Sequence, residues 1–209
     1  MTAPDLIVIT DDALSDDETE LGAARILAQV PPGSTALQLR DRRRSARALL
    51  TLAERLRSLT TRHAAPLIVN DRIDIALAID ADGIHLGGRS IEMGDARRLL
   101  GSGAFLSVAA HAVADVEAAS HAGATAALVA PIFATPGKGS ARGTALLAEV
   151  RARAGDVLVY ALGGIDPSRV VECMRAGAYG VAAIRSVWSR EGGVVAARTM
   201  VDQVRASRR

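Results

Sequence analysis

Two scarce residue types stand where proton transfer or anion binding could take place. His111 follows an apolar, alanine-rich segment, and a histidine that titrates near neutral pH is a common general acid–base. Lys138 is the one lysine among 25 basic residues and lies in the glycine-containing segment 135–139. A compact ammonium in such a loop suits a phosphate or carboxylate contact. The alternatives are a histidine bonded to a backbone carbonyl and an ordinary surface lysine.

Two short segments near the end of the chain have the composition of an anion site. Gly163 and Gly164 let backbone N–H groups approach a phosphate closely, and a following helix would add its positive N-terminal dipole. Ile184, Arg185 and Ser186 close another apolar run, and the guanidinium of Arg185 offers several charged donors. A plain tight turn is the alternative for the two glycines. These five residues are predicted to bind phosphate.

Polar side chains also end two earlier apolar runs. Gln38, Arg40 and Arg42 alternate along the chain and therefore point the same way in an extended segment. If that direction is inward, both guanidiniums face a pocket mouth. Asn70 and Asp71 follow the next run, and they could contact a ligand or simply cap the following helix.

Eight short apolar runs alternate with amphipathic stretches and are predicted to be buried parallel strands. Asp166 followed by Pro167 is typical of a helix start. Eight β–α units in 209 residues indicate a (β/α)8 TIM barrel, with residues 1–209 as a single domain and a doubly wound sheet as the rival fold. Barrel chemistry takes place where strands end, which is where the polar residues above lie. The predicted strands are 6–10, 36–40, 66–70, 83–86, 105–109, 126–130, 157–161 and 180–184.

Composition limits the class of protein. A hydrophobic fraction of 49% with 23% charged residues is ordinary for a globular chain. The longest apolar run, 126–134, is too short to cross a bilayer, and no leader-like segment precedes the first strand. Net charge is +2 and aromatics make up 2%, so a nucleic-acid partner is not expected. With one cysteine, Cys173, no internal disulfide can form. We expect a cytoplasmic protein acting on a small molecule, and the sequence leaves a homo-oligomer open.

Taken together, the strand-end motifs resemble the thiamin phosphate synthase/TenI superfamily, over about residues 5–190 and without a large gap. Each motif is weak alone, but their order and spacing are specific. The resemblance implies a (β/α)8 barrel and places Thr135 among the substrate-binding residues. The matching segments are 6–11, 38–42, 69–74, 81–87, 130–138, 161–165 and 176–178.

That superfamily has two activities, and this sequence departs from the pattern of one of them. Synthases join a hydroxymethylpyrimidine diphosphate to a thiazole phosphate and use magnesium. Tautomerases aromatise a thiazole carboxylate phosphate without a metal. Where synthases carry an aspartate that binds magnesium, this chain has Ser90, and Arg42 replaces their lysine. Because magnesium needs anionic oxygen ligands, its site should be impaired, although Asp71 is retained.

Other positions resemble the tautomerases. The spacing from Lys138 to Arg142 is similar to theirs, and the resemblance gives His111 the role of proton carrier. Ala109 stands where a serine is usual in that strand. We therefore expect an isomerase of the tautomerase type that needs no cofactor, with His111 and Lys138 as catalytic residues.

Two further hypotheses remain. The alternative is a synthase, a transferase in which Arg40, Arg42 and Lys138 hold diphosphate and Asp71 binds magnesium. The third is a non-catalytic protein that binds a phosphate ligand on the same fold.

Overall fold

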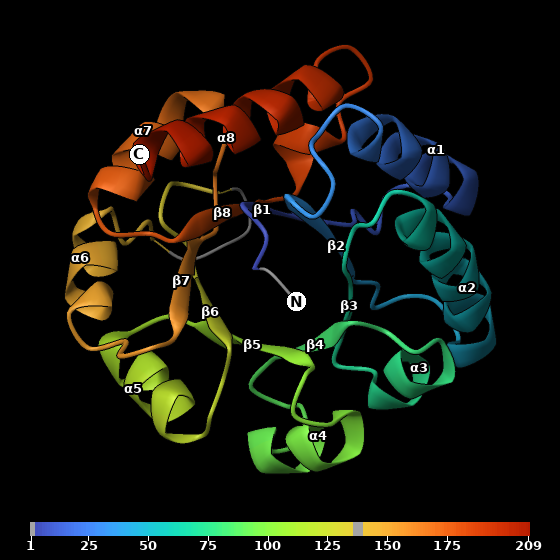
Figure 1. Ribbon diagram of the computed structural model, residues 1–209, viewed down its shortest axis with the longest axis horizontal. Helices are drawn as coiled ribbons and strands as arrows, with labels where there is room; N and C mark the ends of the chain where they lie inside the picture. The colour runs from blue at the N-terminus through green and yellow to red at the C-terminus, as the bar shows by residue number, and fades with distance from the viewer. Residues whose placement is uncertain (1–2, 136–139) are drawn as a thin grey trace.

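Eight parallel strands close into a barrel in the computed structural model, which describes residues 3–135 and 140–209. Figure 1 looks down the barrel and shows the helices outside the ring of strands. The strands are β1 (Leu6–Ile9), β2 (Thr35–Leu39), β3 (Leu67–Asn70), β4 (Gly83–Leu86), β5 (Phe105–Ala110), β6 (Ala126–Val129), β7 (Leu158–Ala161) and β8 (Gly180–Ala183). The α-helices are α1 (Asp16–Leu27), α2 (Ala46–Arg62), α3 (Ile73–Ala78), α4 (Met93–Leu100), α5 (Val113–His121), α6 (Ala145–Arg151), α7 (Val170–Arg175) and α8 (Gly193–Ser207). Two 3₁₀ helices also occur among the described residues, η1 (Pro167–Arg169) and η2 (Arg185–Val187).

Closure of the sheet confirms the barrel and excludes the doubly wound alternative. β8 pairs in parallel with β1, with Leu6 opposite Val181, so the ring has no free edge. Asp166 caps the turn that begins at Pro167, as its position predicted. That first turn is the 3₁₀ helix η1, and α7 starts only at Val170.

The core has an inner and an outer part. Inside the ring, apolar side chains such as Ile7, Phe105 and Tyr160 pack against one another. A larger cluster fills the layer between the strands and the helices. Alternation along each strand sends successive side chains to these two places. Buried polar side chains on β2, β4 and β5 include Gln38, His85 and Ser107.

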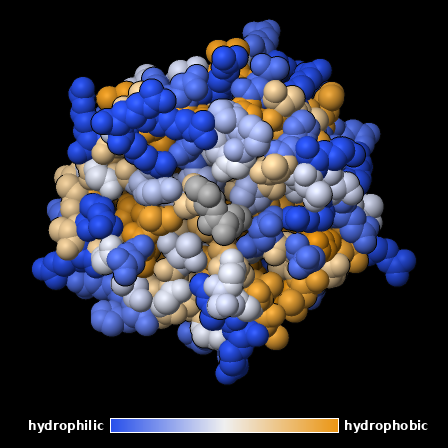
Figure 2. Space-filling model, viewed as in Figure 1, coloured by the Kyte–Doolittle hydropathy of each residue, from blue (hydrophilic) through white to orange (hydrophobic). Residues whose placement is uncertain are grey.

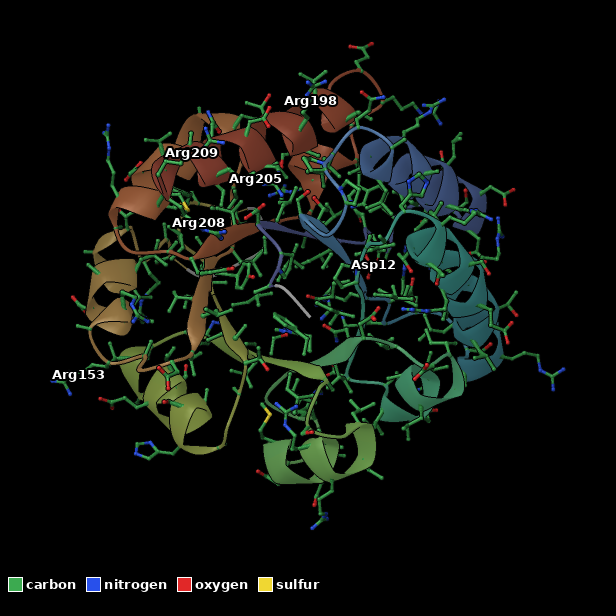
Figure 3. The ribbon with its side chains drawn as sticks, viewed as in Figure 1. Asp12, Arg153, Arg198, Arg205, Arg208 and Arg209 are labelled. Atoms are coloured by element: carbon green, nitrogen blue, oxygen red, sulfur yellow. The ribbon has the colours of Figure 1, made fainter. Side chains whose placement is uncertain are left out.

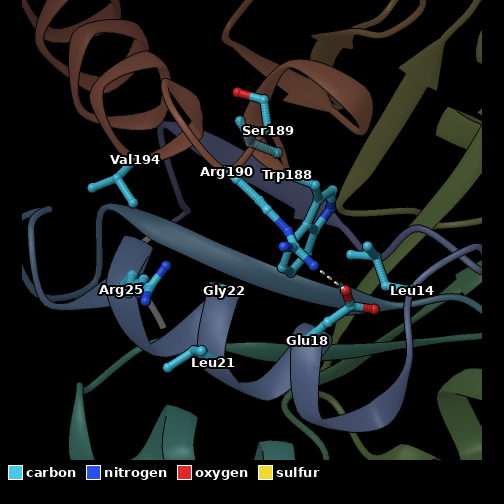
Figure 4. A pocket seen from close by; sticks show the side chains of 10 residues that line it. Leu14, Glu18, Leu21, Gly22, Arg25, Trp188, Ser189, Arg190 and Val194 are labelled. Atoms are coloured by element: carbon cyan, nitrogen blue, oxygen red, sulfur yellow. Dashed lines mark hydrogen bonds and ion pairs between the residues drawn. The ribbon is translucent and has the colours of Figure 1, made fainter.

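The segment after β8 is anchored on α1. The indole N–H of Trp188 donates to the carbonyl of Ile9 over 2.7 Å. Gly22 lets α1 approach the segment after β8, because a Cβ at this position would lie 2.8 Å from the Trp188 ring. A pocket of about 310 Å³ borders the contact between Gly22 and Trp188. At this pocket Arg190 forms an ion pair with Glu18 over 2.8 Å (Figure 4). The contact holds the loop after β8 in place.

The two ends of the described chain meet beside the barrel. Asp5 is 5% exposed and accepts hydrogen bonds from Arg205 over 2.7 Å and from Arg208 over 2.6 Å. Arg205 lies in the last turn of α8 and Arg208 directly follows the helix (Figure 3). Tyr160 donates to the carbonyl of Pro4 over 2.6 Å. These contacts join the entry into β1 to the last helix.

Replacing Asp5 with asparagine is expected to lower the free energy of unfolding by about 2 kcal/mol, since two charge-assisted hydrogen bonds lose their anion. Urea unfolding followed by circular dichroism measures the change. The matched control is Asp202→Asn on α8, the helix that also carries Arg205. The ion pair of Asp202 with Arg198 is 3.9 Å long, and both side chains are over 60% exposed. That control should cost less than about 0.5 kcal/mol. Equal effects of the two substitutions would contradict a stabilising role for the Asp5 cluster.

None of the described helices combines the length and the apolar composition that crossing a bilayer requires. Hydrophilic side chains project around the rim of the molecule in the space-filling view (Figure 2).

Candidate functional site

A pocket of about 270 Å³ lies at the carboxyl ends of β7 and β8. It brings together six residues that the sequence predicted to bind substrate or phosphate. These are Thr135, Gly163, Gly164, Ile184, Arg185 and Ser186.

Close backbone packing shapes this pocket. Gly163 has a φ of +98°, and a Cβ at this position would lie 2.7 Å from the Cα of Pro131. The backbone N–H of Phe133 donates to the carbonyl of Gly163 over 3.0 Å, which ties the loops after β6 and β7 together. The hydroxyl of Ser186 donates to the carbonyl of Ile165 over 2.8 Å, which adds the loop after β8. Three loops are therefore held at fixed positions around the pocket.

Arg169 is a pocket residue that the sequence analysis missed. Its guanidinium lies 4.6 Å from the centre of the Phe133 ring and also donates to the carbonyl of Gly164. Together with the exposed Arg185 it places two positive charges at the pocket. The available signal was its position three residues after the cap Asp166, in the first turn of a helix that follows a glycine pair.

A second basic region lies at the end of β2. Thr10 and Arg40 exchange two hydrogen bonds of 2.9 Å between the threonine hydroxyl and the arginine backbone, which fixes where the strand ends. Burial lowers the pKa of the Arg40 guanidinium, and the neighbouring charge of Arg42 adds to this shift. Asp12 and Asp71 act in the opposite direction. The residue remains an arginine cation at neutral pH because its ordinary pKa is above 12.

Gln38, Asn70 and Asp71 form a chain of hydrogen bonds with a defined direction. The carboxylate of Asp71 only accepts, so Asn70 turns its amide N–H toward Asp71, at 2.7 Å. Gln38 then donates to the amide oxygen of Asn70 over 3.1 Å. This leaves the buried Oε1 of Gln38 without a partner among the described residues. An unpaired buried acceptor is costly and suits a donor on a bound ligand.

The carboxylate of Asp71 also spans the loop after β4. Its Oδ1 accepts from the backbone N–H of Gly87 over 3.0 Å and from the hydroxyl of Ser90. The side chain makes no cap for α3, so the capping alternative is wrong for Asp71. Asp71 has a left-handed φ of +60°, and its carboxylate bonds the loop after β4.

His111 lies on the exposed surface after β5. Its backbone N–H donates to Asp115 over 2.7 Å, and its Nδ1 lies 2.7 Å from the carbonyl oxygen of Ala130. This contact is the backbone-carbonyl alternative given above. Lys138, the other predicted catalytic residue, lies outside the described residues.

The family model, the curated relatives and one similar solved structure point to the same family. The family model for thiamine monophosphate synthase matches residues 6–187. A thiamine-phosphate synthase from Methanoculleus marisnigri is 38% identical over 98% of this chain and 97% of its own length. One from Chloroflexus aurantiacus is 39% identical over 93% of this chain and 90% of its own length. The solved thiamine phosphate pyrophosphorylase from Pyrococcus furiosus has a TM-score of 0.85 at 26% identity, covering 97% of this chain and 96% of that one.

These findings correct the expected reaction. Relatives between 35% and 40% identical are named thiamine-phosphate synthase, so the interpretation as an isomerase of the tautomerase type is wrong. The role of proton carrier for His111 is lost with that reaction, because it was inferred for the tautomerase alone. Because the family model matches residues 6–187 and these relatives cover nearly the whole chain, the chain belongs to the thiamine monophosphate synthase family.

Proposed function

We propose that this protein is a thiamine-phosphate synthase that joins a hydroxymethylpyrimidine diphosphate to a thiazole phosphate. The observation that carries the proposal is the presence of two basic regions at one end of the barrel. One is the pocket after β7 and β8. The other surrounds Arg40 at the end of β2. A reaction between two anionic substrates needs one region for each of them.

The pocket after β7 and β8 is assigned to the thiazole phosphate. Gly163 and Gly164 expose backbone N–H groups at a turn, and Arg169 and Arg185 supply positive charge. The diphosphate is assigned to Arg40 and to the neighbouring, exposed Arg42.

The proposed reaction breaks one bond and forms one. The bond from the pyrimidine methylene carbon to the diphosphate oxygen breaks, and the thiazole nitrogen forms a new bond to that carbon with its lone pair. Negative charge grows on the leaving diphosphate. The positive charges of Arg40 and Arg42 stabilise the negative charge that develops on the diphosphate. The loops around Gly163 hold the thiazole so that its nitrogen faces the reacting carbon.

The residues around Asp71 fit a magnesium ion that the substrate helps to bind. Asp71 Oδ1 is engaged by Gly87 and Ser90, whereas Oδ2 accepts only from Asn70 within the described part of the chain. One lone pair of Oδ2 therefore remains for a metal. No group of three acidic, histidine or cysteine side chains occurs among the described residues. Magnesium is commonly held by one or two carboxylates together with substrate phosphates, and it would neutralise charge on the diphosphate.

The proposal is tested by mixing purified protein with both substrates and magnesium and measuring thiamine phosphate. We expect turnover that EDTA abolishes and excess magnesium restores. In Ser90→Asp a second carboxylate stands beside Asp71, so half-maximal activity should require about tenfold less magnesium. The same variant should gain thermal stability when magnesium is added, because two adjacent carboxylates repel each other without it. No product at any magnesium concentration would overturn the proposal and favour the non-catalytic hypothesis.

A location in the cytoplasm and assembly into a homo-oligomer stay predictions.

A further inference from the structure

A buried histidine and a buried serine face each other inside the barrel. His85 on β4 is opposite Ser107 on β5 in the strand register, and Asn70 on β3 is opposite His85 on its other side. The Nδ1 of His85 lies 3.0 Å from the Oγ of Ser107. His85 is 7% exposed and Ser107 is fully buried. The sequence analysis assigned neither residue a part in the reaction.

The contacts of Ser107 determine where the protons lie. The other acceptor near its hydroxyl, the carbonyl of Ile84, is 3.5 Å away, which is too long for a good O–H···O hydrogen bond. Ser107 therefore donates to Nδ1 of His85. A ring nitrogen that accepts a hydrogen bond must have a free lone pair, so the imidazole is neutral in this arrangement. A neutral imidazole that accepts at Nδ1 carries its proton on Nε2.

The donor at Nε2 remains available. Within the described residues, the buried side-chain atoms without a partner are the Oε1 atoms of Gln38 and Gln203. Among the described residues, the side chain of His85 makes its hydrogen bond at Nδ1 and none at Nε2. Within residues 3–135 and 140–209, Asp71 and Arg40 are charged groups close enough to act on the ring. The Nε2–H group therefore lies at the same end of the barrel as the proposed diphosphate region.

We propose that Ser107 is a positioning residue that holds His85 as its Nε2–H tautomer, so that His85 donates a hydrogen bond to a ring nitrogen of the pyrimidine substrate. This inference rests on the proposed function for the identity of the ligand. A neutral donor suits a neutral ring nitrogen, whereas the diphosphate has Arg40 and Arg42. The unpaired Oε1 of Gln38 supplies an acceptor two strands away. An aminopyrimidine carries both complementary groups, an amino donor and a ring-nitrogen acceptor.

The tautomer can be measured without any substrate. Long-range ¹H–¹⁵N spectra of ¹⁵N-labelled protein distinguish the two neutral tautomers, and loss of signals in His85→Asn assigns the ring. We expect Nε2–H in the unmodified protein and a mixture of tautomers in Ser107→Ala, which removes one oxygen from a buried position. An Nδ1–H tautomer in the unmodified protein, or an unchanged tautomer in Ser107→Ala, overturns the proposal.

Kinetics provide the second test. Ser107→Ala should raise the KM of the pyrimidine diphosphate about tenfold, the typical effect of losing one neutral hydrogen bond, and leave the KM of the thiazole phosphate unchanged. His85→Gln, which can place an amide donor near the position of Nε2, should bind the pyrimidine diphosphate better than His85→Asn. Equal losses in the Gln and Asn variants, or equal changes in both KM values in Ser107→Ala, would show a merely structural role.

The two proposals fail in different ways. If the unmodified protein makes no thiamine phosphate, the proposed function fails while the spectra still report the tautomer. If it is active and Ser107→Ala binds pyrimidine diphosphate normally, only the positioning role of Ser107 is wrong.

Discussion

Replacing Asp71 with asparagine is expected to lower kcat by about 10³-fold, because one change removes two functions. The carboxylate is the proposed magnesium ligand, and it is the acceptor that orients Asn70 and Gln38. An asparagine amide could present N–H to Asn70 and reverse that chain. Asparagine also tolerates the φ of +60° at this position, so the backbone is not strained by the change. Steady-state kinetics at saturating substrates and magnesium measure the effect.

Asp74→Asn is the matched control for this substitution. Asp74 lies on the adjacent helix α3, pairs with Arg72, and has a side chain that is 60% exposed. Loss of the Asp74 carboxylate should change kcat less than twofold. Binding of manganese in the presence of diphosphate, followed by electron paramagnetic resonance, gives a readout apart from turnover. Normal manganese binding and near-normal kcat in Asp71→Asn would show that this carboxylate holds no metal.

Replacing Gly163 with alanine should raise the KM of thiazole phosphate about 10²-fold. The new Cβ would lie 2.7 Å from the Cα of Pro131, so the loops after β6 and β7 must separate. A displacement of about 1 Å in a positioned site costs roughly this much in efficiency. A φ of +98° also disfavours any L side chain, so the free energy of unfolding should fall by about 2–4 kcal/mol. Initial rates and urea unfolding measure the two effects.

Gly101→Ala separates backbone strain from the clash. Gly101 has a φ of +83°, but a Cβ at this position would meet no atom within 4 Å, and the residue ends α4 away from the pocket. Its substitution should lower stability by about 1 kcal/mol and leave both KM values unchanged. If Gly163→Ala behaved like this control, the pocket after β7 would not bind thiazole phosphate.

Local pattern was enough to predict the strands. Predicted and observed ends differ by one residue at most, as for 105–109 against Phe105–Ala110. Strands inside a barrel are buried on both faces, so each is a short apolar run that ends where polar residues begin. The same ends placed the residues predicted to bind phosphate around one pocket, since parallel strands bring all their carboxyl ends to one edge.

The reaction was harder to infer from single positions. Ser90 and His111 favoured a tautomerase, although the likeness to synthases covers nearly the whole chain. In the proposed site, the missing carboxylate would weaken magnesium binding without abolishing it, because Asp71 and the substrate phosphates could share the ion. Ser90 itself donates to Asp71. Ser90 therefore holds the proposed metal ligand by a hydrogen bond and adds no negative charge of its own.

The sequence by itself determined the order of the elements, the barrel and the location of its functional edge, because these follow from apolar periodicity and strand direction. Only the tertiary structure decided which side chains meet across that edge. The side chain of Asp71 bonds Ser90, Arg169 joins the pocket after β7 and β8, and Ser107 bonds His85. Each of these contacts joins residues from different strands or loops, and depends on barrel register and on which donors and acceptors burial leaves within about 3 Å of each other. The sequence around each residue does not determine such distances between different strands and loops.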